Sequence, residues 1–320
     1  MNLEETAQLA EKICENVKKV ITGKDDVIAL AVNALFAGGH LLLDDVPGTG
    51  KTMLAKSLAR SVSAEFRRVQ FTPDLLPTDL TGINYYNQKQ CDFVFRKGPV
   101  FTNILLADEI NRAMPRTQSS LLECMEERQV TADGETYALT EPYFVIATQN
   151  PVETQGTFPL PEAQLDRFLF RSSIGYPEAK SAVELLTRRN NTGDPYAALA
   201  PVCTADDIVQ AQKAADGVFV HPDLLAYIVA AVESTRSYNG VTLGVSPRGS
   251  VALLRAVKAR AAMQGRGFVT PEDIKQLAPF VFAHRMTLRE EYDMSAPKSA
   301  DIVADILASL PVPSEKWSGD

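Results

Sequence analysis

The chain has 320 residues, 45% of them hydrophobic and 22% charged, a composition typical of a globular protein of about two domains. Its net charge of −8 argues against a protein that holds the nucleic-acid backbone, since such proteins usually carry a basic surface. The longest uncharged apolar run, Leu224–Val232, is far short of the roughly 20 residues that span a bilayer. The N-terminus carries early glutamates and no secretory signal, and the four scattered cysteines favour reduced thiols, so we expect a cytoplasmic protein without membrane insertion.

Apolar spacing predicts how the chain begins. Residues at helical spacing predict amphipathic helices over 3–21 and 25–37. A buried strand over Leu41–Leu43 follows, then a glycine-rich turn and a helix over 51–64. Further strands are expected at 66–71, 103–110, 144–148 and 169–174.

Two β-hairpins are expected between these strands. The turn-rich segment 72–99 predicts a short helix interrupted by a hairpin, whose alternating aromatic strands lie within 83–97. Residues 130–139 predict a second hairpin, because an Asp-Gly turn lies at its middle. A helix is expected between the two hairpins, over 111–129.

The character of the chain changes after residues 175–177, Gly-Tyr-Pro, where strand patterns give way to helices. We therefore expect an α/β domain with a parallel sheet over residues 1–176, a smaller all-α lid domain over 178–313 and a tail over 314–320. Helix starts in the lid are signalled by Thr204 with Asp207, by Ser246 with Pro247, and by Thr270 and Pro271 with Asp273.

The segment His40–Thr52, HLLLDDVPGTGKT, places a glycine-rich turn between a strand and a helix, which predicts a phosphate-binding P-loop. Turn N–H groups and the following helix N-terminus favour phosphate there, with Lys51 on the β- and γ-phosphates and the Thr52 hydroxyl on Mg²⁺. Asp45 replaces the first glycine of the general pattern, and we expect its carboxylate to point away from the triphosphate. The residues expected to bind ATP are Pro47, Gly48, Thr49, Gly50, Lys51, Thr52 and Met53.

An acid pair, Asp108 and Glu109, follows the apolar run ILLA at the carboxyl end of an expected strand, where open α/β sheets place their ligands. Asp108 is expected to hold Mg²⁺, through water, and Glu109 to polarise the water that attacks the γ-phosphate. Together the two acids point to ATP hydrolysis. Asn150 ends the next strand, where it could contact the γ-phosphate or that water, although asparagine also suits turns.

For each of two arginines, the sequence alone permits two interpretations. Arg167, in LPEAQLDRF, could simply form a surface ion pair with Asp166, a contact worth little. Arg248 opens a helix in Ser-Pro-Arg, where a solvated first-turn arginine is an equally good interpretation.

Taken together, these motifs resemble those of the AAA+ ATPases. The amino-acid sequences of six of them resemble one branch of that class, the MoxR family. The resemblance extends from about Gly23 to His284, nearly the whole chain, and only Asp45 departs from the general P-loop pattern. The six motifs are GGHLLLDDVPGTGKT, FTPDLLPTDLTG, LLADEINRA, TQSSLLECMEERQVT, FVIATQNP and LPEAQLDRFLF.

The resemblance implies further residue roles. Asn150 matches the first sensor, and Arg167 matches the arginine finger that reaches into a neighbouring subunit's ATP site. Arg248 matches the second sensor, which contacts phosphate from the lid of its own chain. Gln70, which ends the second strand, is a candidate to couple Glu109 to the first hairpin.

The resemblance also implies a homo-oligomer, a ring of six subunits, that binds ATP and Mg²⁺ between the α/β domain, the lid and the next subunit. Hydrolysis would move the lid against the core, and the hairpins, facing the pore or its substrate, would pull or reshape a protein client. The family is linked to chaperone-like maturation of other proteins, often with a partner that carries a von Willebrand factor A domain. Nucleic acid is not an expected partner.

Three other functions compete with this one. A nucleic-acid motor of helicase type shares such hairpins, but here they carry only Lys89, Arg96 and Lys97 as basic residues, too few for a track along phosphates. The ATPase subunit of a metal chelatase is similar over the core. Only the closer match of the motif sequences to the MoxR family distinguishes the two interpretations. A non-hydrolysing ATP switch is disfavoured by the intact Glu109 and Arg167.

Overall fold

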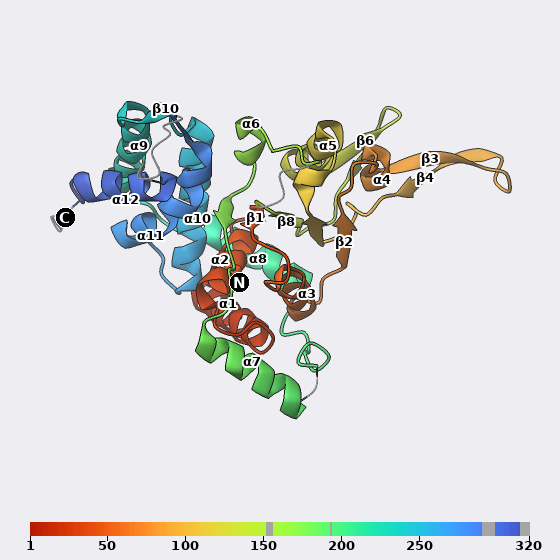
Figure 1. The fold of residues 1–320 in the computed structure, drawn as a ribbon, viewed down its shortest axis with the longest axis horizontal. Helices are drawn as coiled ribbons and strands as arrows, with labels where there is room; N and C mark the ends of the chain where they lie inside the picture. The colour runs from red at the N-terminus through yellow and green to blue at the C-terminus, as the bar shows by residue number, and fades with distance from the viewer. Residues whose placement is uncertain (152–155, 193, 290–297, 314–320) are drawn as a thin grey trace.

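The computed structural model describes residues 1–151, 156–192, 194–289 and 298–313, arranged around one parallel sheet (Figure 1). The sheet has five strands in the order β2-β5-β8-β1-β9, and each neighbouring pair is parallel. All the carboxyl ends therefore meet at one edge, as the α/β prediction requires. The strands are β1 (Leu41–Asp44), β2 (Phe66–Gln70), β5 (Ile104–Asp108), β8 (Phe144–Gln149) and β9 (Phe170–Ser172).

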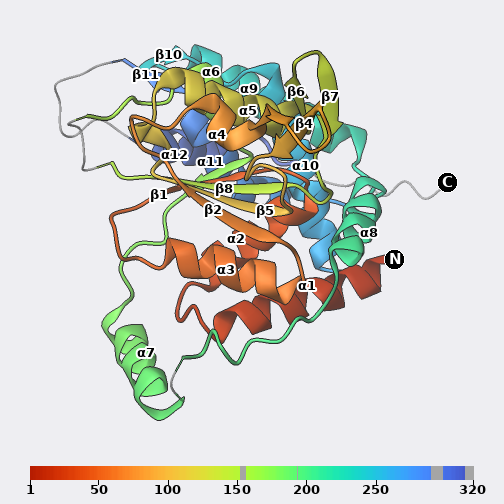
Figure 2. The same ribbon diagram turned by 90° about the vertical axis from the view of Figure 1, so that its right-hand side faces the viewer.

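Alternation along the strands gives the sheet two buried faces. Leu41 and Leu43 of β1 belong to one apolar cluster, whereas Leu42 between them belongs to the other. Figure 2 shows the first face covered by α1, α2 and α3, and the second by α4 and α5. These helices are α1 (Leu3–Lys18), α2 (Asp25–Phe36), α3 (Lys51–Ser61), α4 (Pro77–Thr81) and α5 (Pro115–Glu127).

One predicted helix is shorter than expected. The segment 111–129 forms a single 3₁₀ turn, η1 (Ile110–Arg112), before α5 begins at Pro115. Proline has no N–H to donate and fits the first turn of a helix, so Pro115 starts α5.

Both predicted hairpins are present, and the first projects far from the body of the molecule (Figure 1). The expected continuation of α4 beyond the first hairpin is wrong. Gly98 lies so close to the backbone of Leu80 and Gly82 that a Cβ there would meet main-chain atoms, and the chain turns directly into β5. The hairpins are β3 (Gly82–Asn87) with β4 (Asp92–Lys97), and β6 (Gln129–Ala132) with β7 (Glu135–Ala138).

The two hairpins contact each other through two pairs of side chains. Phe95 of β4 stacks on Tyr137 of β7 with ring centroids 4.3 Å apart. Asn84 of β3 donates from Nδ2 to the Asp133 carboxylate, which lies in the turn of the second hairpin, at 2.6 Å.

The second half of the chain is mostly helical, and the predicted capping boxes are present at α8 and α11. It is not entirely helical, because β10 (Val241–Leu243) pairs antiparallel with β11 (Thr287–Leu288). Among the described residues, no helix combines the length and apolar character needed to cross a membrane. The remaining elements are α6 (Glu162–Leu165), α7 (Ala179–Thr192), α8 (Ala205–Asp216), α9 (Pro222–Ser237), α10 (Pro247–Met263), α11 (Pro271–Phe282), η2 (Ala283–Arg285) and α12 (Ser299–Ser309).

A buried arginine fixes the helical part to the sheet. Arg285 of η2 donates to the Asp166 carboxylate at 2.6 Å and to the carbonyls of Phe168 and Leu169, just before β9. The helices α8 to α12 also share one apolar cluster with α1 and α2. The start of α10 is thereby held beside the amino-terminal edge of the sheet. The predicted tail, 314–320, lies outside the described residues.

Candidate active site

The predicted P-loop follows β1 at the carboxyl edge of the sheet. Gly48 and Gly50 adopt φ of 87° and 99°, backbone conformations that favour glycine. Lys51 opens α3 and is 9% exposed; its ammonium donates to the Asp45 carbonyl at 2.7 Å. The lysine is thus held against the loop that its sequence position predicts to surround a phosphate.

Asp45, the departure from the general pattern, points away from the loop as expected. Its carboxylate accepts hydrogen bonds from the backbone N–H groups of Ile174 at 2.6 Å and Gly175 at 2.8 Å, and from the Ser173 hydroxyl at 3.1 Å. The side chain is 4% exposed. Asp45 therefore ties β1 to the segment after β9, and its charge is satisfied by donors outside the P-loop.

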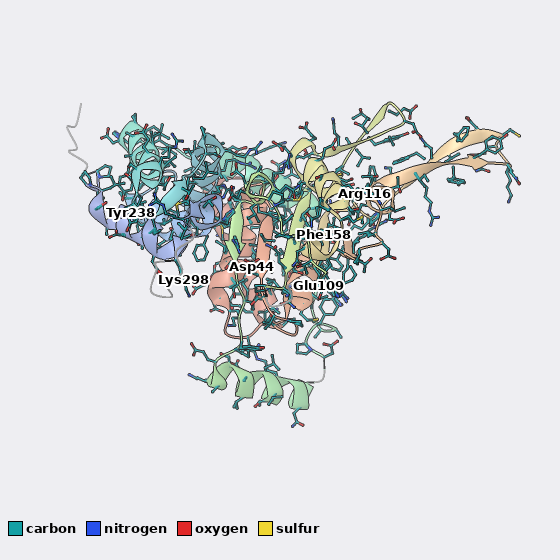
Figure 3. The ribbon with its side chains drawn as sticks, turned by 45° about the horizontal axis from the view of Figure 1, so that its top comes forward. Asp44, Glu109, Arg116, Phe158, Tyr238 and Lys298 are labelled. Atoms are coloured by element: carbon teal, nitrogen blue, oxygen red, sulfur yellow. The ribbon has the colours of Figure 1, made fainter. Side chains whose placement is uncertain are left out.

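The acid pair lies at the same edge, two strands away (Figure 3). Asp108 ends β5, and its Oδ1 accepts a hydrogen bond from the buried Thr148 hydroxyl of β8 at 2.7 Å. The same hydroxyl accepts the backbone N–H of Glu109 at 2.9 Å. Glu109 adopts a left-handed φ of 55°, a conformation that costs about 1–3 kcal/mol in a residue other than glycine and is concentrated at functional sites.

Arginine and glutamine side chains hold both acids. Arg68 of β2 donates from Nε at 3.1 Å and from Nη2 at 2.7 Å to the same oxygen of Asp108. Glu109 accepts from Gln70 at 2.6 Å and from Arg112 at 3.0 Å. Contact between Gln70 and Glu109 is thus present, and its coupling to the first hairpin stays a prediction.

Sequence reasoning missed Arg68, Arg112 and Thr148. Arg68 and Thr148 lie within predicted strands, and their contacts depend on which strands are neighbours. Asn150 follows β8, between β5 and β1 in the sheet, and is 5% exposed. The structure therefore brings Lys51, Asp108, Glu109 and Asn150 to one edge of one sheet.

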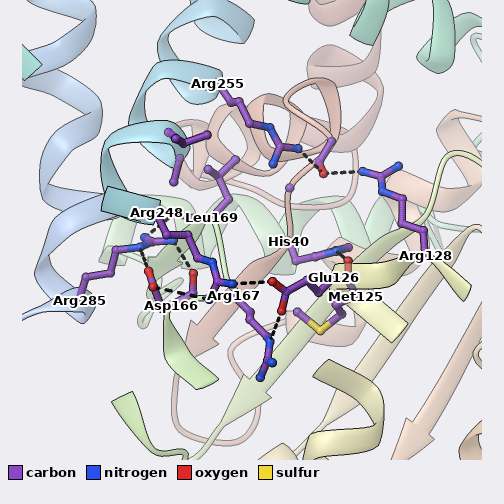
Figure 4. Close-up of a pocket in the computed structure, with 14 residues that line it drawn as sticks. His40, Met125, Glu126, Arg128, Asp166, Arg167, Leu169, Arg248, Arg255 and Arg285 are labelled. Atoms are coloured by element: carbon purple, nitrogen blue, oxygen red, sulfur yellow. Dashed lines mark hydrogen bonds and ion pairs between the residues drawn. The ribbon is translucent and has the colours of Figure 1, made fainter. Parts of the chain in front are cut away.

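Arg167 lies at the opposite edge. It precedes β9, and two residues later the Leu169 N–H donates to the carbonyl of His40, just before β1, at 2.9 Å. Four residues of β1, about 13 Å of extended chain, separate this edge from the P-loop. A cavity of about 220 Å³ lies here, and the arginines that line it are Arg128, Arg167, Arg248, Arg255 and Arg285 (Figure 4).

The structure differs from the expectation for Arg248. This residue lies beside Arg167, because both donate to the carboxylate of Glu126, and its Nη1 is 3.8 Å from Asp166. It is on the edge away from the P-loop of its own chain, so it makes no contact with that loop. The physical reason is the attachment of the lid through Arg285, which holds the start of α10 at the amino-terminal edge.

A parallel sheet with a P-loop after one strand, an acid pair two strands away and a helical domain packed beside it defines an AAA+ ATPase. Family models support this class. The model for the ATPase family associated with various cellular activities matches residues 40–170, and the model for the AAA lid domain matches residues 233–306.

Whole-chain relatives narrow the class. The chain is 40% identical to Chaperone MoxR1 of Mycobacterium tuberculosis, over 95% of this chain and 82% of the relative. It is 47% identical to the uncharacterized protein YeaC of Bacillus subtilis, over 98% of both chains. A solved structure from Cytophaga hutchinsonii, assigned there as an ATPase, superimposes with a TM-score of 0.90 at 36% identity, over 98% of this chain and 97% of that one. The chain belongs to the MoxR family of AAA+ ATPases.

Proposed function

We propose that this chain hydrolyses ATP to ADP and phosphate at sites shared between neighbouring copies, and that hydrolysis drives the remodelling of a partner protein. One observation carries the proposal: the nucleotide-binding residues and Arg167 lie at opposite edges of one sheet. One copy therefore cannot bring both groups to one triphosphate. Two copies in head-to-tail contact bring the edges together, and repetition of a head-to-tail contact closes a ring when the rotation permits.

In this proposal the chain's own residues divide the chemistry at the carboxyl edge. The loop N–H groups and Lys51 bind the phosphates, and Glu109 orients the attacking water with Asn150. Asp108 and the Thr52 hydroxyl would hold Mg²⁺, because carboxylate and hydroxyl oxygens are ligands of the kind that this ion prefers. Mg²⁺ bound there would neutralise part of the phosphate charge.

At the other edge, Arg167 contacts the γ-phosphate held by the next copy and stabilises charge in the transition state. Arg248 lies beside it on Glu126, so we assign it to the same neighbouring site and no longer to the site of its own chain. This assignment keeps the phosphate contact expected from the family but changes the subunit that supplies it.

The projecting hairpin is the proposed contact for a protein client. Ile83 and Tyr85 on one face of the hairpin, and Tyr86 and Phe93 on the other, are between 45% and 68% exposed, so both faces present apolar groups to water. We propose a hexameric ring in the cytoplasm, with a protein client and a partner carrying a von Willebrand factor A domain. The name of MoxR1 as a chaperone supports a role in protein maturation. The helicase-type and chelatase alternatives are not favoured, because MoxR1 and another relative that matches over nearly the whole chain carry the MoxR name.

The decisive experiment is Mg²⁺-dependent ATP hydrolysis per subunit, measured over a wide range of protein concentration. Activity per subunit is expected to rise with concentration as copies associate, because each site needs two chains. A mixture of Lys51→Ala and Arg167→Ala chains provides the internal check. Each variant alone is inactive, whereas the mixture restores sites with the P-loop of one variant and the arginine of the other. Flat activity together with failure of the mixture would show that the site is complete within one chain.

A further inference from the structure

Glu126 occupies the centre of the arginine edge. It lies in the last turn of α5 and accepts from Nε of Arg167 at 2.7 Å through Oε2, and from Nη2 of Arg248 at 2.5 Å through Oε1. Figure 4 shows the carboxylate between the two arginines, with the end of Arg167 pointing away from it. One carboxylate thus joins the core, the segment before β9 and the lid.

The way in which Arg167 is held is specific. Only its Nε is engaged, and within the described part of the chain no protein group is bonded to Nη1 or Nη2. A guanidinium recognises phosphate best through two N–H groups in a planar fork. A carboxylate bound at Nε fixes the plane of the guanidinium while the terminal fork stays available to a ligand.

The end of the helix that carries Glu126 is itself anchored to the segment before β1. The carbonyl of the preceding residue, Met125, is bonded to the buried ring of His40 at 3.1 Å, and Arg128, which ends α5, donates to the carbonyl of Gly38 at 2.8 Å. The hydrogen bond from Arg167 lowers the pKa of Glu126 below its usual value, so the carboxylate is charged at neutral pH.

The other acid in the cavity, Asp166, is engaged elsewhere. It accepts from Arg285 at 2.6 Å and from the Ser246 hydroxyl at 3.0 Å, and its Oδ2 lies 3.8 Å from Nη1 of Arg248. Among the described residues no ion pair joins Asp166 to Arg167, so without Glu126 the Arg167 guanidinium would face Arg248 with no carboxylate of its own. The repulsion of two like charges would then spread their side chains over several orientations.

We propose that Glu126 is a positioning residue for hydrolysis in the neighbouring subunit: it holds Arg167 by Nε so that the free fork meets the γ-phosphate of the next copy. The proposal rests on the proposed function, because it requires a site shared between copies. In this role Glu126 acts through Arg167 and not directly on ATP or the attacking water, and it sets the distance between Arg167 and Arg248.

The first test is steady-state kinetics of Glu126→Gln, with Glu127→Gln as the matched control. Glu127 is the next residue of α5, is exposed and makes no ion pair within the described part of the chain. We expect Glu126→Gln to lower kcat roughly ten- to a hundredfold, as small misplacements of catalytic groups do, with KM for ATP unchanged. The control keeps kcat within twofold. A kcat within twofold of the parent for Glu126→Gln overturns the proposal.

A second test separates positioning from damage to the fold. If Glu126 acts only through Arg167, the double variant Glu126→Gln/Arg167→Ala has the same kcat as Arg167→Ala alone, within about twofold. Additive losses in the double variant show that Glu126 acts elsewhere and overturn the proposal.

The third test is complementation in mixed assemblies. Glu126→Gln chains keep an intact P-loop, and Lys51→Ala chains keep an intact arginine edge, so the mixture is expected to exceed the summed activity of its parts. If Arg167→Ala complements Lys51→Ala but Glu126→Gln does not, the positioning role is wrong and the shared site stands. If neither mixture complements, the shared site itself is refuted and the role of Glu126 falls with it.

Discussion

Arginine side chains lie at both edges of the central sheet, and they are held in opposite ways. At the carboxyl edge, Arg68 turns one whole side of its guanidinium, Nε and Nη2, onto the Asp108 carboxylate. At the amino-terminal edge, Arg167 is held by Nε alone and its terminal fork is left to a ligand. At the carboxyl edge the arginine covers the Asp108 carboxylate that the proposed function requires. At the amino-terminal edge the required group is the Arg167 guanidinium itself, and its terminal N–H groups are exposed to a ligand. Exposure of a charged side chain therefore says less about its role than which of its atoms are engaged.

The largest expected effect concerns the carboxyl edge itself. Lys51→Ala removes the charge that contacts the β- and γ-phosphates, so ATP binding and turnover are both expected to be lost. Glu109→Gln removes the group that orients water but keeps the phosphate contacts, so ATP is expected to bind and to be retained. Equilibrium binding of a fluorescent ATP analogue and a hydrolysis assay distinguish the two. Tight ATP retention by Lys51→Ala, or full turnover by Glu109→Gln, contradicts these roles.

The next effect tests the other edge. Arg167→Ala is expected to bind ATP normally and to hydrolyse it about a thousandfold more slowly, the lower end of the range known for arginines supplied in trans. Arg248→Ala is likewise expected to bind ATP normally and to hydrolyse it more slowly. It is also expected to complement Lys51→Ala in mixtures, since Arg248 lies at the same edge as Arg167. If Arg248→Ala weakened ATP binding in its own chain and failed to complement, the original assignment to the cis site would be restored.

The difference between the edges also marks what the sequence could predict. The P-loop and the acid pair are local patterns, because strand, turn and helix follow one another in the chain and the chemistry lies in consecutive residues. Arg68 and Thr148 meet Asp108 only because β2 and β8 are the neighbours of β5, an order that no local pattern contains. Even the side chain of Asp45 could be predicted to point away, since its position in the motif lies at the strand end.

The arginine edge was less predictable, for a physical reason. Arg167, Arg248 and Glu126 come from three separate elements, and their meeting depends on how the lid packs against the sheet. Each of them alone has the pattern of a solvated surface charge. The family resemblance supplied roles for the two arginines, but it expected Arg248 at the P-loop of its own chain, whereas the fold places it beside Arg167, and it was silent on Glu126.

The stability of the fold in acid offers a third way to compare the edges. The buried histidines His40 and His284 lie at the amino-terminal edge, beside its arginines. Burial lowers the pKa of His40 to about 3, against about 6.5 in the unfolded chain. Between these values the unfolded state binds the extra proton, so the free energy of unfolding falls as the pH is lowered, by about 1.4 kcal/mol per pH unit for this residue.

Chemical unfolding between pH 6.5 and 5 tests this contribution. His40→Gln is expected to make the pH dependence shallower by about the slope of one histidine, whatever its effect on stability at neutral pH. An unaltered slope for His40→Gln would mean that acid acts first on other parts of the fold.

The smallest expected effect tests the ion pair between Arg68 and Asp108 at the carboxyl edge. Because Arg68 pairs with Asp108, a cation that binds Asp108 has to compete with a guanidinium that is itself about half exposed. Exposed pairs are worth about 0.2–1 kcal/mol, so Arg68→Gln is expected to lower the Mg²⁺ concentration needed for half-maximal ATP-analogue binding by about two- to fivefold. Arg67→Gln, at the neighbouring position of β2, is the control, because within the described residues Arg67 pairs with Glu65 and not with Asp108. A higher Mg²⁺ requirement for Arg68→Gln would instead make Arg68 a support for the site, and both edges would then present their arginines in the same way.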